Sequence, residues 1–153
     1  MNMDVNKIFD LFSGGREGDG DYTQQELEDL RKMEEFKESP MFKVGMFKKL
    51  IFNHLAYKDR IIDLFKNVKP NLNIYELEEA GETITFERGW EFISQCEIDK
   101  EEWQQCLILY NDEEIKVALR LSINFFQDLE EYEKCAYLKK ILDFCEKSLA
   151  VPE

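Results

Sequence analysis

Apolar residues recur every three or four positions along most of this chain, which is the spacing of helices that bury one side. The pattern is clearest at Trp103, Cys106, Leu107 and Tyr110, which stand at positions i, i+3, i+4 and i+7. Asp99 precedes them and has a side chain that can accept hydrogen bonds from the free amides of a first helical turn. A helix with Asp99 as its N-cap is therefore expected.

Two more helices are expected after this one, at 112–126 and at about 129–148. The connection between them is only a few residues long, so they should pair as an antiparallel helical hairpin. The side chains expected to be buried are Ile115, Leu119, Ile123 and Phe126 in the first, and Leu129, Tyr132, Ala136, Leu142 and Cys145 in the second.

The N-terminal part begins with a short apolar pattern at 4–12, formed by Val5, Ile8, Phe9 and Phe12. A glycine-rich loop follows. Thr23 and Glu26 then have the spacing of a capping box, in which each side chain accepts a hydrogen bond from the backbone of the other. A helix should start there, bury the stripe Leu27, Leu30 and Met33, and end at Ser39-Pro40.

The middle of the chain predicts two successive helices, at 41–55 and 57–68. Each has apolar residues at helical spacing, and Lys69-Pro70-Asn71 breaks the pattern after the second. The expected buried side chains are Phe42, Met46, Phe47, Leu50, Ile51 and Leu55 in the first helix, and Ile61, Leu64, Phe65 and Val68 in the second.

Residues 72–87 fit two structures. Ile84 and Phe86 alternate as in a short strand, and Glu79-Ala80-Gly81 suits a turn, so a small β-hairpin is slightly favoured. Asn73 with Glu76 could instead cap a short helix.

These patterns predict a mainly α fold, a compact domain of six to seven helices with a C-terminal helical hairpin. At 153 residues, the chain is long enough for one self-sufficient core and hardly for two. A single domain, 1–153, is expected, with three parts: an N-terminal helix–loop–helix at 1–38, basic helices at 39–70 and an acidic helical part at 71–153.

The charge of the chain says more about its surface than its length does. The chain carries 33 acidic and 20 basic residues, a net charge of −13, together with 12 Phe, 6 Tyr and 2 Trp. So many rings can bury enough apolar surface to fold, which places the excess acid on a rigid surface rather than a disordered tail. The segment 39–70 has a net charge of +5 and 71–102 one of −8, so the basic helices are expected to pack or pair against acidic neighbours.

An acidic folded surface without a recognisable catalytic motif favours a non-enzymatic module that docks on a basic surface of another protein, as inhibitors, immunity or anti-defence proteins and nucleic-acid mimics do. Steering by charge would speed the encounter. Direct binding to nucleic acid or to an anionic membrane is not expected at this charge. The candidate contact residues are Glu76, Glu78, Glu79, Glu82, Glu87, Glu91, Glu101, Glu102, Glu113, Glu114, Glu130 and Glu131.

One segment offers a different function. Asp19, Gly20, Asp21 and Thr23 precede Glu26 at the start of a helix, and over residues 5–31 the chain resembles an EF-hand, whose loop surrounds calcium with oxygen ligands. Counting back from Glu26 as position twelve puts Gly15 where an Asp is usual. Counting from Ser13 gives a fourteen-residue loop similar to the enlarged first loop of calgranulin-type EF-hand proteins.

The resemblance implies a calcium-responsive module at 13–26 with Asp19, Asp21 and Glu26 among the ligands. A second regular loop is missing, since Asn67–Glu78 has Lys69 and Leu72 where an acid and the glycine belong. Turn and capping needs account for the same residues without a metal, so no cofactor is the first expectation and Ca²⁺ the alternative.

The remaining candidate groups for chemistry are four cysteines and one histidine. Cys96, Cys106, Cys135 and Cys145 lie in helical patterns without C-x-x-C spacing, which is typical of buried reduced thiols in an intracellular protein. His54 stands between apolar residues with no partner fixed by sequence, and is expected to be an ordinary partly buried side chain. An enzyme built from scattered residues is a further alternative, and a deep pocket that joins His54 to a Cys or a carboxylate would favour it.

The sequence has no apolar run of about 18 residues, the length needed to span a membrane, and its first residues lack the pattern of a secretory signal. A cytoplasmic, reducing location is therefore expected.

Overall fold

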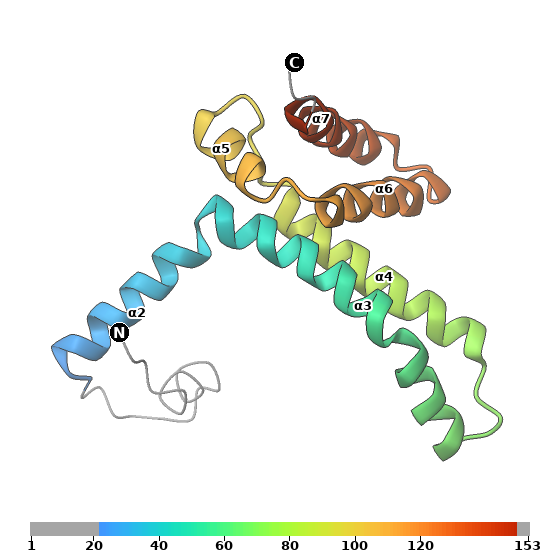
Figure 1. Ribbon diagram of the computed structural model, residues 1–153. Helices are drawn as coiled ribbons and strands as arrows, with labels where there is room; N and C mark the ends of the chain where they lie inside the picture. The colour runs from blue at the N-terminus through green and yellow to red at the C-terminus, as the bar shows by residue number, and fades with distance from the viewer. Residues whose placement is uncertain (1–21, 150–153) are drawn as a thin grey trace. The chain divides into compact units, whose positions relative to one another are not determined.

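In a computed structural model, the described residues 22–149 form helices joined by short loops, with no strand among them (Figure 1). The predicted mainly α fold is confirmed. The expected helix at 4–12 lies outside the described residues. The helices are α2 (Gln24–Lys37), α3 (Pro40–Val68), α4 (Ile74–Ile93), α5 (Glu101–Leu109), α6 (Glu113–Asp128) and α7 (Tyr132–Leu149).

The chain divides into two compact units, Met1–Phe36 and Lys37–Glu153. The boundary falls close to residue 38, where the sequence pattern also changes. In the first unit, α2 begins with the predicted capping box: the amide of Glu26 donates to Oγ1 of Thr23 at 3.2 Å, and the amide of Thr23 donates to Oε2 of Glu26 at 2.9 Å. The predicted stripe on α2 is only partly covered, because Leu27 is 52% exposed.

Residues 40–68 form one helix of 29 residues instead of the two that the sequence predicted. Ser39 caps it by accepting the amide of Phe42 at 3.2 Å, and Pro40 occupies its first turn, where a missing amide costs nothing. Nothing between residues 55 and 58 breaks the helix, since this stretch holds neither glycine nor proline.

The prediction that Leu55 and the apolar residues of 57–68 are buried is wrong. Phe47 and Ile51 are buried, but the later side chains are largely exposed and Ile62 is the buried residue of that half. Figure 1 shows the outer half of α3 beside α4 and away from α5–α7, so among the described residues of this unit only the side that faces α4 is covered. The misassigned residues, with their exposed fractions, are Leu55 (36%), Ile61 (47%), Leu64 (65%), Phe65 (49%) and Val68 (86%).

The β-hairpin at 72–87 is also wrong, because these residues begin α4. Oδ1 of Asn73 accepts the amides of Tyr75 at 3.1 Å and Glu76 at 3.4 Å, so the alternative capping interpretation is the correct one. Ile84 and Phe86 would share one face of a strand, but in a helix two positions are about 200° apart. Accordingly Phe86 is buried and Ile84 is 70% exposed.

The predicted start of α5 needs a small correction. Lys100 takes the N-cap position without a side-chain hydrogen bond, and Asp99 precedes it. Trp103, Cys106 and Leu107 are buried as expected. Tyr110 is the C-cap of this helix, and its amide donates to the carbonyl of Cys106 at 3.0 Å.

The C-terminal hairpin of α6 and α7 is confirmed, with Asp112 as the N-cap of α6: its carboxylate accepts the amide of Ile115 at 3.0 Å and the ammonium of Lys48 at 2.7 Å. Burial would raise the pKa of Asp112, but these two interactions outweigh it and lower that pKa. Lys48 also lies 3.3 Å from Glu114, so a base of the 39–70 segment does pair with acids of a later segment.

The predicted buried residues of α7 are confirmed only in its second half. Residues 129–131 form the turn between α6 and α7, where Glu130 has a φ of 60°, so Leu129 lies outside the helix. Leu142 and Cys145 are buried as predicted, together with Leu138 and Ile141, whereas Leu129, Tyr132 and Ala136 are exposed.

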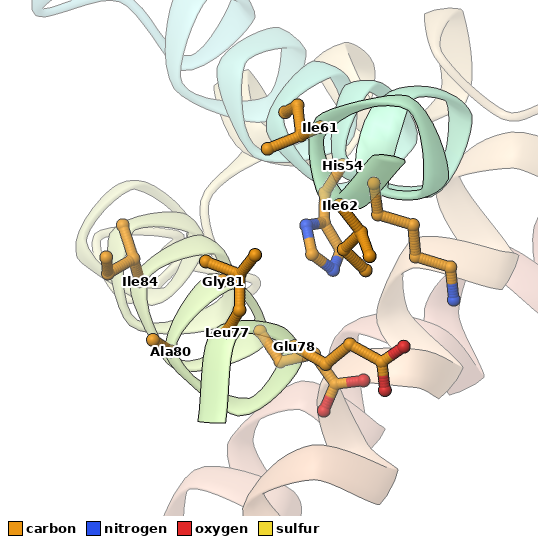
Figure 2. A pocket seen from close by; sticks show the side chains of 10 residues that line it. His54, Ile61, Ile62, Leu77, Glu78, Ala80, Gly81 and Ile84 are labelled. Atoms are coloured by element: carbon orange, nitrogen blue, oxygen red, sulfur yellow. The ribbon is translucent and has the colours of Figure 1, made fainter. Parts of the chain in front are cut away.

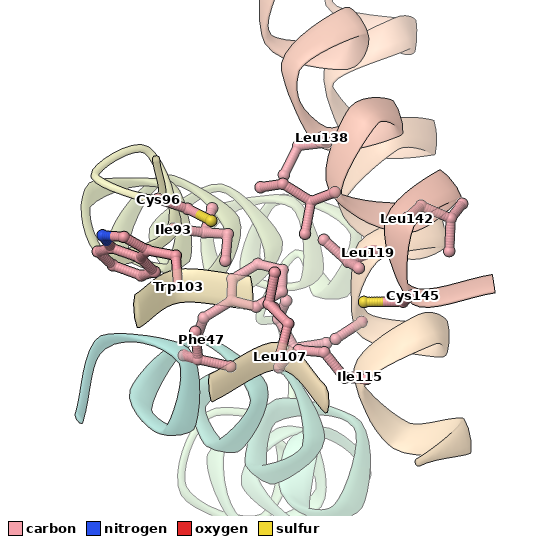
Figure 3. Packing of buried hydrophobic residues seen from close by; sticks show 14 of the residues in the cluster. Phe47, Ile93, Cys96, Trp103, Leu107, Ile115, Leu119, Leu138, Leu142 and Cys145 are labelled. Atoms are coloured by element: carbon pink, nitrogen blue, oxygen red, sulfur yellow. The ribbon is translucent and has the colours of Figure 1, made fainter. Parts of the chain in front are cut away.

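The core lies where the inner half of the α3–α4 hairpin meets α5, α6 and α7 (Figure 3). Each of these helices contributes at least one buried side chain, for example Phe47, Ile93, Leu107, Leu119 and Leu138. In Figure 1, the outer half of the hairpin extends away from α5–α7. The second unit therefore has a well-packed inner end and an outer helical hairpin with much exposed apolar surface.

Candidate functional site

The twelve predicted acidic residues are all exposed, but they do not form one surface. Six lie on α4, two at the start of α5, two at the start of α6 and two in the turn before α7. Four have a basic neighbour within ion-pair distance: Glu91 with Arg88, Glu113 with Lys116, Glu114 with Lys48, and Glu131 with Lys134. The structure thus separates paired surface acids from unpaired ones.

Three of the eight candidate acids without an ion pair among residues 22–149 share one face of α4. Glu78, Glu79 and Glu82 stand three, four and seven residues after Tyr75, so the four side chains share a helix face. None of the three carboxylates has an ion pair among residues 22–149, and Tyr75 is 81% exposed. We call Tyr75, Glu78, Glu79 and Glu82 the acidic face. Sequence reasoning named its glutamates but missed the tyrosine, which helical spacing would have added had residues 72–87 been assigned to a helix.

A pocket of about 200 Å³ lies between the outer halves of α3 and α4 (Figure 2). In the view of Figure 2, Ile61, Ala80 and Ile84 lie on one side of the hairpin and Glu78 on the other. The lining is mostly aliphatic, with a few ionisable side chains at its edge. The lining residues are His54, Lys58, Ile61, Ile62, Leu77, Glu78, Ala80, Gly81, Glu82 and Ile84.

His54 points across this pocket toward Gly81, where an added Cβ would lie 3.4 Å from Cε1 of the imidazole. Burial lowers the pKa of His54; Glu82 acts in the opposite direction and Lys58 adds to the decrease. The pocket does bring His54 close to carboxylates, the arrangement that would favour an enzyme built from scattered residues. Its lining, however, includes no hydroxyl or thiol that could act as a nucleophile beside the imidazole.

The lowered pKa of His54 predicts a pH dependence of stability. Since the unfolded chain binds the proton more tightly, the contribution of His54 is present above its unfolded pKa near 6.5 and is lost as the pH falls through its folded pKa. We expect the free energy of unfolding of the wild type to fall from pH 7 to pH 5 more than that of His54→Gln. His54 is the only histidine in the chain, so urea titrations of both proteins isolate its effect. If the free energy of unfolding depends on pH equally in both proteins, the lowered pKa of His54 is contradicted.

The described residues include only the end of the loop at 13–26, the segment of the calcium alternative. No group of three or more His, Cys, Asp or Glu side chains within residues 22–149 is arranged to hold a metal ion. Glu26 uses Oε2 to cap α2. Asp19 and Asp21 lie outside the described residues, so the calcium-responsive loop at 13–26 stays a prediction.

The cysteines are free thiols, of which Cys96, Cys106 and Cys145 are buried and Cys135 is partly buried. Burial raises the pKa of Cys96 to about 12 and those of Cys106 and Cys145 to about 11. A thiol with so high a pKa is almost entirely protonated at neutral pH and is a poor nucleophile. The prediction of buried thiols that act as small apolar side chains is confirmed for these three.

Comparisons of the chain with protein-family models, with curated proteins and with solved structures gave no significant match. Among the described residues, no helix has the length and apolar character required to cross a membrane.

Proposed function

We propose that this chain is a non-enzymatic protein-binding module, and that the acidic face of α4 docks on a basic surface of another protein. The observation that carries the proposal is the set of three unpaired carboxylates around a tyrosine that is 81% exposed. An inhibitor, an immunity or anti-defence protein, and a mimic of a nucleic acid backbone would each use such a surface.

Helical geometry favours this function. An exposed helix offers a partner side chains at positions i, i+3, i+4 and i+7, and Tyr75, Glu78, Glu79 and Glu82 have this spacing. The asparagine cap at residue 73 fixes the first turn that carries the tyrosine. The face is therefore held in place before any partner binds, which reduces the entropy cost of docking.

The two residue types have different roles in the proposed contact. Tyrosine is enriched among the residues that dominate binding energy, because it buries a large ring and keeps a hydroxyl for hydrogen bonding. Surface carboxylates contribute more to the rate of encounter and to the choice of partner. The net charge of −13 adds a long-range field that attracts basic surfaces and weakens as salt increases.

The test starts with affinity capture from the native source on the immobilised chain, eluted with a salt gradient, followed by titration of the purified partner. We expect Glu78→Gln with Glu79→Gln and Glu82→Gln to weaken binding at low salt by about tenfold or more. Tyr75→Ala should weaken it by a similar factor at all salt concentrations.

The matched control is Glu28→Gln with Glu34→Gln and Glu133→Gln, which removes the same charge from exposed acids elsewhere. If only the total charge matters, both triple variants will lose the same affinity and the acidic face will be excluded as the site. Binding that does not change with salt would refute the electrostatic docking itself.

A further inference from the structure

The outer half of α3 has an apolar seam with the spacing of a helix–helix interface. Tyr57, Ile61, Leu64 and Val68 are separated by four, three and four residues, the alternation by which helices pack in coiled coils. Their side chains are 51, 47, 65 and 86% exposed. The spacing therefore predicts a neighbouring helix that the described residues of one chain do not supply.

The adjacent edge of α4 extends this seam. Ala80 and Ile84 lie on the same side of the hairpin as Ile61 in Figure 2, and Ile84 is 70% exposed. We call Tyr57, Ile61, Leu64, Val68, Ala80 and Ile84 the apolar flank. Eight of the fifteen exposed large hydrophobic side chains of the described residues lie between residues 55 and 84, and contiguous apolar patches of this kind mark interaction surfaces.

Charged residues occupy the outer edges of the two helices. Lys49 and Arg60 are eleven residues apart, which is about three helical turns, so they share one edge of α3. Each stands two residues before a buried isoleucine, Ile51 or Ile62, and therefore about 200° around the helix from the covered side. Asp63 lies three residues after Arg60 on the same edge, so this edge of α3 has two bases and one acid and a net positive charge.

The matching edge of α4 is acidic. Glu76 and Glu87 are also eleven residues apart and share one edge. Glu87 stands two residues before the buried Gly89, and so points away from α3. Like Lys49 and Arg60, both glutamates are exposed and have no ion pair among residues 22–149.

The contacts between α3 and α4 show which charged residues of the two helices stand at the same height along the hairpin. A Cβ on Gly89 would lie 3.3 Å from Phe47, and one on Gly81 would lie 3.4 Å from His54, so these positions face each other across the antiparallel pair. Lys49, two residues after Phe47, is thus level with Glu87, two residues before Gly89. Arg60 is six residues after His54, and Tyr75 is six residues before Gly81. Arg60 is therefore level with Tyr75 and its neighbour Glu76.

We propose that two copies of this chain pair through the apolar flank, about a two-fold axis that runs along the hairpin, so that α3 of each copy lies on α4 of the other. The same surface is used by both copies, as in most homodimers, and four helices then enclose the two apolar flanks. Lys49 of each copy comes to the level of Glu87 of the other, and Arg60 to that of Glu76, like the charged pairs that flank a coiled-coil seam.

Charge selects this arrangement over the alternative. If α3 lay on α3 of the second copy, bases would face bases and the acids of the two α4 helices would also meet, which opposes association. The proposal does not rest on the acidic face, because Glu78 lies on the opposite side of the hairpin from Ile61 and Ile84 (Figure 2).

Sedimentation equilibrium of the full chain tests the interface. We expect the wild type to move from the 18.3 kDa monomer to the dimer within about 1–100 μM. Ile61→Glu with Leu64→Glu should raise the dissociation constant by about a hundredfold or more, since both charges would be buried in the apolar flank. The matched control, Ile108→Glu with Leu109→Glu, changes two exposed apolar residues of α5 and should leave the dimer intact. All of the substituted side chains are at least 47% exposed, so circular dichroism should show an unchanged fold.

Charge reversal tests the orientation. Lys49→Glu with Arg60→Glu should weaken the dimer by about tenfold or more, and the further changes Glu76→Lys and Glu87→Lys should restore it at the wild-type net charge. The proposed interface is wrong if the wild type stays monomeric or if the dimer survives Ile61→Glu with Leu64→Glu. The proposed orientation is wrong if the four charge changes together do not restore the dimer. The three glutamine substitutions of the acidic face should leave the dimer unchanged. Failure of the proposed dimer can therefore be distinguished from failure of the proposed partner binding.

Discussion

Leu107→Ala is expected to lower the free energy of unfolding by about 3–5 kcal/mol. Leu107 is completely buried on α5 and belongs to the core where α3, α6 and α7 meet (Figure 3). Truncation removes the transfer free energy of the lost carbons and leaves a cavity that surrounding helices fill only in part. Because typical domains are stable by about 5–15 kcal/mol, this change should remove a large share of the stability. Urea denaturation followed by circular dichroism measures it.

Leu109→Ala is the matched control. It is the same substitution two residues later in the same helix, but Leu109 is 74% exposed and should cost at most about 0.5 kcal/mol. Both titrations must be run at one protein concentration, because dimer formation would make the apparent stability depend on concentration. Similar losses in both variants would show that the assigned register of α5 is wrong.

Gly89→Leu is expected to destabilise the protein by about 1–3 kcal/mol, although leucine has the higher helix propensity by up to about 1 kcal/mol. Gly89 is buried in α4, and a Cβ there would lie 3.3 Å from Cδ2 of Phe47, inside the usual carbon–carbon contact distance of about 3.5–4.0 Å. A full leucine side chain must therefore push α3 and α4 apart. Thermal or urea denaturation measures the loss.

Gly81→Ala in the same helix provides the contrast. A Cβ at this position lies at an ordinary contact distance, 3.4 Å from the imidazole of His54, so the gain in helix propensity should dominate and stabilise the protein by up to about 1 kcal/mol. Opposite signs for the two glycines are the expected result. If Gly89→Leu is neutral, the close approach of α3 and α4 at Phe47 is not maintained in solution.

The elements predicted with most success are those whose signals are local. Thr23 and Glu26 cap α2 as predicted because both partners of the capping box are within four residues. The spacing of Trp103, Cys106 and Leu107 located the buried side of α5, since a helix with one covered face must repeat its apolar residues at that period. These interactions need no knowledge of the rest of the fold.

Two of the predictions that failed were based on the spacing of apolar residues alone. Ile84 and Phe86 alternate like a strand, yet the hydrogen bonds of Asn73 to the first turn of α4 and the packing of Phe86 against Phe125 fit a helix. Likewise, apolar residues at helical spacing on α3 indicated a buried face, but spacing alone does not say which helix covers it. Val68, at the outer end, is 86% exposed.

For the candidate surfaces too, some features could be predicted from the sequence and others could not. The sequence named the glutamates of α4 and the basic character of residues 39–70 from composition alone. It could not tell that Glu91 and Glu114 have basic neighbours while Glu78, Glu79 and Glu82 do not, because Lys48 reaches Glu114 only through the fold.

By itself, the sequence determined the helical class, most helix positions and the excess of negative charge, because capping, periodicity and composition act over one or two turns. Only the tertiary structure decided that the inner half of the α3–α4 hairpin is covered and the outer half is not. It also decided which acids remain unpaired and which charges stand level across the two helices. The reason is physical: burial and ion pairing depend on which surfaces meet, and residues far apart in sequence meet only after the helices have packed.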